Sequence, residues 1–172
     1  MSSNYPAAMV PAAKRPKPLG RSEAAFWQSL MRALVVVPRV LDEDLEEMEH
    51  LSVNQYSILV FLSEAQDRQM RIGDLADITS LTISGITRLI NRLVADGLVE
   101  RRRCEDDGRG FYAVLTQRGL DRLERAYPTH LASARRHVMD HLAGFDLDAL
   151  AEAFMHFGDQ KYEVFKRVPS QR

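Results

Sequence analysis

Apolar residues recur at three- and four-residue steps between residues 82 and 97: Ile83, Ile86, Ile90, Leu93 and Val94. This spacing predicts a helix over 82–96 with those side chains on one face. Thr82 can cap its start, and Gly97 provides a stop. The other face carries short hydrogen-bonding side chains and cations, with no carboxylate before Asp96: Ser84, Gly85, Thr87, Arg88, Asn91 and Arg92. Such a face suits the base edges and phosphates of a DNA duplex.

The segments on either side of this helix predict a helix-turn-helix with a wing. Residues 98–104 and 111–115 are short and β-prone, and the turn between them contains two glycines and several acidic residues. Before them, residues 72–77 form a short predicted helix and 79–81 the turn. Residues 82–96 would then be the recognition helix.

The remaining apolar stripes predict four longer helices. They cover 22–48, interrupted by Pro38; 53–65, begun by a capping box at Ser52–Gln55; about 117–142, which Pro128 should kink or divide; and about 147–166. Residues 64–70 are interpreted as a polar connection, and the proline-rich, basic residues 1–20 as a disordered tail. The expected fold class is mainly α with a small β-wing, the winged domain being flanked by helices at both ends.

Four phrases occur in order along this predicted domain. They are RIGDLAD, TISGITRLINRLVADGLVER, Asp107-Gly108-Arg109 and Leu115-Thr116-Gln117-Arg118-Gly119. With them the chain resembles the MarR family of winged helix-turn-helix transcriptional regulators over roughly 22–168. The resemblance implies a MarR-type domain at 21–168, with the winged helix at 50–118 and dimerisation helices at 22–48 and 119–168. It also implies a homodimer, a palindromic operator in double-stranded DNA and often a small phenolic or aromatic effector.

The resemblance and the polar face together define a predicted DNA-binding set. Arg88 could fork onto a guanine, while Asn91 and Arg92 suit phosphates. The resemblance places Arg109 in the minor groove, with Asp107 holding its guanidinium. Residues 101–103 alternate along a strand, so the three arginines cannot all face DNA. The full set is Ser84, Gly85, Thr87, Arg88, Asn91, Arg92, Arg101, Arg103, Asp107 and Arg109.

Composition adds few constraints beyond this pattern. The 23 basic and 24 acidic residues give a formal net charge of −1, so DNA binding has to depend on local charge. The single cysteine, Cys104, cannot form an internal disulfide, which fits a reducing cytoplasm. No apolar run of membrane-spanning length is evident. We therefore expect a cytoplasmic protein without a membrane partner.

Three further groups have both a functional and a plain structural interpretation. Phe26, Trp27 and Tyr56 could line an effector pocket, or simply belong to the core. His137 and His141 have metal-compatible spacing, but a closed site needs more ligands than lie nearby. Cys104 lacks the surroundings of a reactive thiol. No metal and no cofactor are expected.

The leading hypothesis is a sequence-specific regulator of transcription, most simply a repressor released by a small molecule. The alternative is a winged-helix module that binds another protein instead of an operator. An enzyme is not expected, because no glycine-rich phosphate loop, nucleophile elbow or HExxH motif occurs. The operator, the effector and the choice between repression and activation stay open.

Overall fold

The protein is described by a computed structural model that covers residues 17–79, 81–104 and 110–157. It contains two compact units, Met1–Val36 and Val37–Arg172. Helix α1 (Arg21–Glu49) extends through the boundary between them and contains Pro38 just after it. The helix therefore matches the predicted 22–48 within one residue at each end, and Pro38 does not end it.

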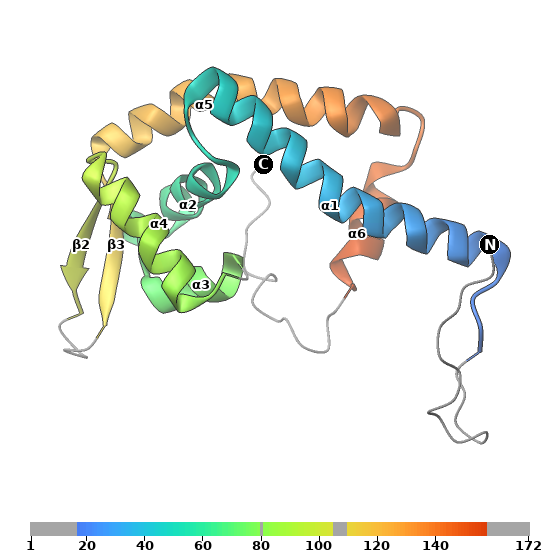
Figure 1. Ribbon diagram of the computed structural model, residues 1–172, viewed down its shortest axis with the longest axis horizontal. Coiled ribbons are helices and arrows are strands. Elements are labelled where there is room, and N and C mark those ends of the chain that lie inside the picture. Colours follow the sequence, from blue (N-terminus) through green and yellow to red (C-terminus); the bar gives the residue numbers. More distant parts are fainter. Residues whose placement is uncertain (1–16, 80, 105–109, 158–172) are drawn as a thin grey trace. The chain divides into compact units, whose positions relative to one another are not determined.

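The second unit contains the winged helix-turn-helix (Figure 1). Its helices are α2 (Val53–Glu64), α3 (Ile72–Thr79) and α4 (Ile83–Ala95), and its wing strands are β2 (Val99–Arg103) and β3 (Phe111–Leu115). Helix α2 begins with the predicted capping box, in which the Ser52 hydroxyl accepts the Gln55 N–H and the Gln55 side chain accepts the Ser52 N–H. The predicted fold class, mainly α with a small β-wing, is confirmed.

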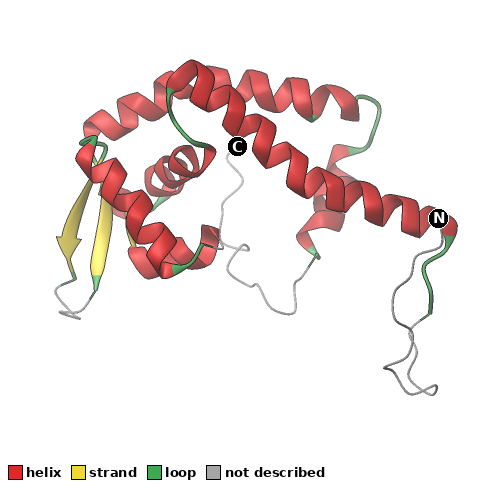
Figure 2. Ribbon diagram, viewed as in Figure 1, coloured by secondary structure: helices red, strands yellow, loops and turns green. Residues whose placement is uncertain are grey.

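A third strand was missed. Residues Gln69–Arg71 form β1, which pairs antiparallel with β3 so that the sheet order is β1-β3-β2. Figure 2 shows the two longer strands of this sheet in yellow. The interpretation of 64–70 as a polar connection was wrong for residues 69 and 70, which belong to this strand. Three residues are too few for an alternating pattern to be visible in the sequence, and the strand exists because β3 satisfies its backbone groups.

Helix α4 supplies much of the core of the second unit. Its buried side chains are Ile86, Leu89, Ile90 and Leu93. Ile83 and Val94 were predicted on this face but are 61% and 37% exposed. Helix α4 packs on α2, α3 and β2, and these contacts, rather than the apolar spacing alone, determine the buried stripe. Leu89 takes the place that the sequence pattern assigned to Ile83 and Val94.

The first C-terminal helix is shorter than the predicted 117–142. Helix α5 (Gln117–His137) continues through Pro128, so the proline does not divide it. A 3₁₀ turn, η4 (Met139–Leu142), follows, and α6 (Leu147–Met155) begins with the predicted Asp146 cap, whose carboxylate accepts the Ala149 N–H. The end of the predicted 147–166 helix lies outside the described residues.

Helix α1 also bears on the membrane prediction. It has 29 residues, and an 18-residue window reaches a mean hydropathy of 1.2, so by length and composition it could cross a bilayer. No run of this length was predicted from the sequence, so this prediction was wrong for α1. The core helix of a soluble protein or a signal sequence meets the same criterion, and a central arginine such as Arg32 opposes insertion. The criterion alone therefore does not assign α1 to a membrane.

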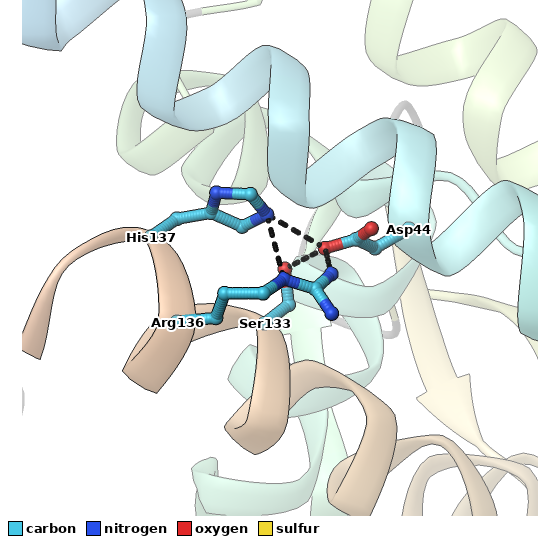
Figure 3. A network of polar contacts seen from close by, with 4 residues as sticks. All are labelled: Asp44, Ser133, Arg136 and His137. Atoms are coloured by element: carbon cyan, nitrogen blue, oxygen red, sulfur yellow. Dashed lines mark hydrogen bonds and ion pairs between the residues drawn. The ribbon is translucent and has the colours of Figure 1, made fainter. Parts of the chain in front are cut away.

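Two polar clusters join the end of α1 to α5. In the first, the Asp44 carboxylate accepts hydrogen bonds from Ser133 and from Arg136 Nη2 at 2.6 Å, and His137 Nε2 lies 3.1 Å from it (Figure 3). The hydrogen bond from Ser133 is the main cause that lowers the pKa of Asp44. Figure 3 shows the three α5 side chains converging on this one carboxylate.

The second cluster lies further along α1, five residues after Asp44. Glu49 accepts hydrogen bonds from Thr129 Oγ1 at 2.7 Å and from Arg122 Nη1 at 2.9 Å, and Arg122 also donates to the Glu49 carbonyl. Both the Glu49 and Arg122 side chains are mostly buried, at 14% and 17% exposure. Together the clusters hold the end of α1 against α5.

Candidate nucleic-acid interface

The recognition helix α4 packs against α2, α3 and β2 and has a capping residue at each end. Thr82 precedes it in extended conformation, and its hydroxyl accepts the Gly85 N–H at 3.1 Å. After the helix, Gly97 adopts a φ of +70°, a left-handed conformation that suits glycine. Both terminal signals identified in the sequence are confirmed.

The face opposite the core is open to solvent. Ser84, Arg88, Asn91 and Arg92 are exposed, while Gly85 and Thr87 are partly buried. The first carboxylate along α4 comes only at its C-cap, Asp96. The structure thus places the six predicted α4 residues as an accessible, cationic, hydrogen-bonding surface; their contact with DNA stays a prediction.

Gly85 lies beside the capping side chain. A Cβ at this position would be 3.2 Å from Thr82 Oγ1 and 3.8 Å from Leu81 Cβ. Alanine would therefore press on the hydroxyl that caps the helix. Within the described residues, this capping hydroxyl is the nearest obstacle to a side chain at position 85.

The register of the wing separates its three arginines. Arg101 pairs with Ala113 across the β2–β3 ladder and Arg103 pairs with Phe111, so both point to the sheet face that also buries Val99. Arg102 points to the other face, where it donates to Gln69 of β1. The prediction that the three cannot share one face is confirmed. Arg101 and Arg103 remain the candidates for DNA.

The tip of the wing lies outside the described residues. This applies to Asp107 and Arg109, the pair that the family resemblance places at the minor groove. Their roles stay predictions.

The corner between α4 and α5 is built around two residues of the Leu115–Gly119 phrase. Thr116 caps α5 by accepting the Gly119 N–H at 2.9 Å, and its hydroxyl also lies 2.8 Å from the carbonyl oxygen of Gly97. Its own N–H donates to the Leu98 carbonyl at 3.1 Å. Gly119 is buried so close to this turn that a Cβ would collide with the Leu98 carbonyl.

The position of Thr116, directly before the apolar stripe of 117–142, predicts this cap from the sequence alone, and the cap is confirmed. The need for glycine, by contrast, comes from a backbone carbonyl 21 positions earlier in the chain.

Comparison with known proteins agrees with this geometry. The MarR family model matches residues 51–110. The HTH-type transcriptional repressor YetL of Bacillus subtilis (strain 168) is 32% identical over 127 residues, which is 69% of this chain and 74% of YetL. The chain belongs to the MarR family. The MarR family transcriptional regulator AbsC from Streptomyces coelicolor is 36% identical, with a TM-score of 0.74 over 84% of this chain and 97% of AbsC.

A second solved MarR regulator extends the comparison to DNA. Sco3205 from Streptomyces coelicolor, solved in complex with DNA, is 29% identical with a TM-score of 0.77, covering 85% of this chain and 91% of that chain. Membership of the family and the exposed cationic face of α4 both indicate that the protein binds DNA. The protein is a DNA-binding transcriptional regulator.

The residues predicted for a MarR-type effector pocket fall in separate units. Phe26 and Trp27 belong to the first unit, and Tyr56 lies in the core of the second at 4% exposure. The Tyr56 ring packs on the His130 ring, with centroids 4.4 Å apart. Burial raises the pKa of Tyr56 to about 12 and lowers that of His130. His130 Nδ1 is buried without a hydrogen-bond partner among the described residues. The contact between Tyr56 and His130 was not predicted from the sequence.

Neither of the other sensing candidates gains support from geometry. Cys104 is buried at 2% exposure, which removes the access that a reactive thiol needs. His137 contacts Asp44 rather than His141. Across the described ranges, no cluster of three or more His, Cys, Asp or Glu side chains could hold a metal ion.

Proposed function

We propose that this MarR regulator is a homodimeric repressor that binds a palindromic operator and is released by a small aromatic or phenolic effector. The observation that carries the proposal is the exposed face of α4, where cations and amides occur without a carboxylate. In this proposal residues 50–118 bind DNA, Arg88 reads a base edge, and Arg101, Arg103, Asp107 and Arg109 belong to the wing contact. Residues 22–48 and 119–168 form the dimer.

Support for the dimer comes from apolar side chains that the second unit leaves uncovered. They lie on α5, η4 and α6 and on the segments after them, and each is 40–62% exposed: Tyr127, Leu131, Met139, Phe145, Leu147, Phe154, Met155 and Phe157. An extended apolar surface of this kind is typical of a protein interface. A two-fold dimer would place two α4 helices about 34–36 Å apart, one turn of DNA, which requires a palindrome.

Support for an effector comes from the Tyr56–His130 pair. A buried polar atom without a partner is rare, because it costs about 1–3 kcal/mol. A phenolic hydroxyl could donate to His130 Nδ1, and the rest of an aromatic ligand could pack against the rings of the pair.

Arg88→Ala tests operator recognition. The palindrome upstream of the divergently transcribed neighbouring gene is the DNA to use, measured by fluorescence anisotropy over a salt series against a scrambled duplex. Loss of a bidentate contact to guanine should weaken operator binding at least tenfold, about 1.4 kcal/mol, and reduce preference over the scrambled duplex. Arg21→Ala removes an exposed cation at the first residue of α1, outside the residues assigned to DNA or to the dimer, and should change neither value.

Two results would contradict the proposal. Equal affinity of the wild-type protein for palindrome and scrambled DNA would favour the protein-binding alternative. Operator preference that survives Arg88→Ala unchanged would exclude Arg88 as a base reader, even if overall affinity falls.

His130→Phe tests the effector. Phenylalanine keeps the packing on Tyr56 and removes the unpartnered nitrogen, so thermal stability should not fall. Operator binding without ligand should be unchanged, whereas the salicylate concentration needed to release the operator should rise about tenfold, as expected for one lost buried hydrogen bond to a ligand. Release by the same salicylate concentration in both proteins would place the effector elsewhere.

A further inference from the structure

A pocket with a volume of about 530 Å³ lies at the corner where α1 ends, α4 ends and α5 begins. Leu51 and Leu98, both buried, contribute an apolar part of its lining. Three arginines of α5 line it as well: Arg118, Arg122 and Arg125. They recur at four- and three-residue steps, so they share one face of the helix. The volume lies in the range of small-molecule sites.

The three guanidinium groups differ in whether they form hydrogen bonds and ion pairs. Arg122 is bound to Glu49, which also accepts the Thr129 hydroxyl, so these charges are compensated. No hydrogen bond or ion pair joins Arg118 or Arg125 to any residue that the structure describes, although Arg125 lowers the pKa of Glu49 at longer range. With Asp96 also in the lining, three cations face two carboxylates. The pocket therefore has a positive balance and two free guanidinium groups.

We propose that this pocket binds a small organic phosphate, with the phosphate between Arg118 and Arg125 and the organic part against Leu51 and Leu98. A guanidinium presents its N–H groups as a fork that matches phosphate oxygens, and a phosphate monoester near neutral pH has close to two negative charges. One ligand would thus satisfy both free arginines.

The position of the pocket links such a ligand to the recognition helix. Arg118 lies over the turn that ends α4, with its Cδ 3.8 Å and its Nη1 3.9 Å from where a Gly97 Cβ would be. A phosphate held by Arg118 and Arg125 would bridge this turn to the third turn of α5. The site is separate from the Tyr56–His130 pair, and ligand binding there requires neither an operator nor a dimer.

The test is a titration of the full-length protein with inorganic phosphate, without DNA and at constant ionic strength, followed by the backbone amide NMR signals of Gly97 and Leu98. Saturable shifts are expected. Arg118→Gln with Arg125→Gln should weaken the apparent affinity at least tenfold, since two charge-assisted contacts are lost. The control, Arg39→Gln with Arg135→Gln, removes the same charge from exposed positions and should leave the titration unchanged.

Three outcomes would overturn the proposal: linear, non-saturating shifts in the wild type; equal weakening in the control; or an unchanged titration in the Arg118/Arg125 variant. If the double variant does not fold, each single variant should still weaken binding. Should the variant instead flatten the salt dependence of operator binding without affecting the phosphate titration, the two arginines are DNA contacts and the pocket is no ligand site. Failure of operator binding itself would leave the phosphate result unaffected.

Discussion

Replacing Gly119 with alanine should lower the free energy of unfolding by about 3 kcal/mol, the upper end of the usual cost of overpacking. The added Cβ would collide with the Leu98 carbonyl and would come within 2.7 Å of Leu115 Cδ1. The carbonyl cannot move freely, because it accepts the Thr116 N–H at 3.1 Å. Alanine normally gains about 0.5–1 kcal/mol over glycine inside a helix, so the expected change has the opposite sign to helix propensity.

Gly73→Ala is the matched control for this measurement. Gly73 also lies in a helix, α3, but a Cβ there would meet no atom within 4 Å. It should leave stability unchanged or raise it, by at most about 1 kcal/mol. Urea unfolding followed by circular dichroism, at fixed protein concentration, gives both values. If Gly119→Ala proves as stable as the wild type, α5 can move away from the α4–β2 turn at little cost, and the corner does not hold the recognition helix in place.

The elements that could be predicted from the sequence are those with strong local signals. Thr82, Gly97 and the apolar steps between them define α4 within one residue, and Ser52 with Gln55 defines the start of α2. Candidate DNA-binding residues followed from the same helix, because the polar face of a helix is fixed once its apolar face is known.

What the sequence could not reveal depends on partners distant in the chain. Leu89 is buried in place of Ile83 because of what packs on α4, and β1 exists only through its pairing with β3. Asp44 and Ser133 are 89 positions apart, and the requirement for glycine at 119 depends on a carbonyl in another element. Local periodicity contains no information about such pairs.

Arg122→Leu should destabilise the protein by about 3 kcal/mol, the lower end of the cost of breaking a buried ion pair. The substitution removes the ion-pair partner of Glu49, and among the described residues Thr129 is then the one side chain that still donates a hydrogen bond to this mostly buried carboxylate. Stability of the single variants Arg122→Leu and Glu49→Gln and of the double variant, measured by urea unfolding, forms a double-mutant cycle. The double variant should be more stable than the two single effects predict, because neither charge is then left alone.

The same ion pair should make the stability of the folded protein depend on pH in the acid range. The hydrogen bond from Thr129, aided by Arg122, keeps the pKa of Glu49 below its usual 4.5. A carboxylate with a lowered pKa contributes stability that is fully present above the unfolded value and is lost as pH falls through the folded one. Wild-type stability should therefore decline below about pH 4.5, as linkage to this carboxylate requires.

Asp44, whose pKa is lowered from 3.8, should add to the loss further down the pH scale. Glu49→Gln has no charge to titrate at this position. The free energy of unfolding, measured between pH 5 and pH 3, should therefore fall less steeply with pH in that variant than in the wild type. Identical slopes would mean that Glu49 is equally acidic in the folded and unfolded chains. The junction of α1 with α5 would then depend on packing rather than on this charge.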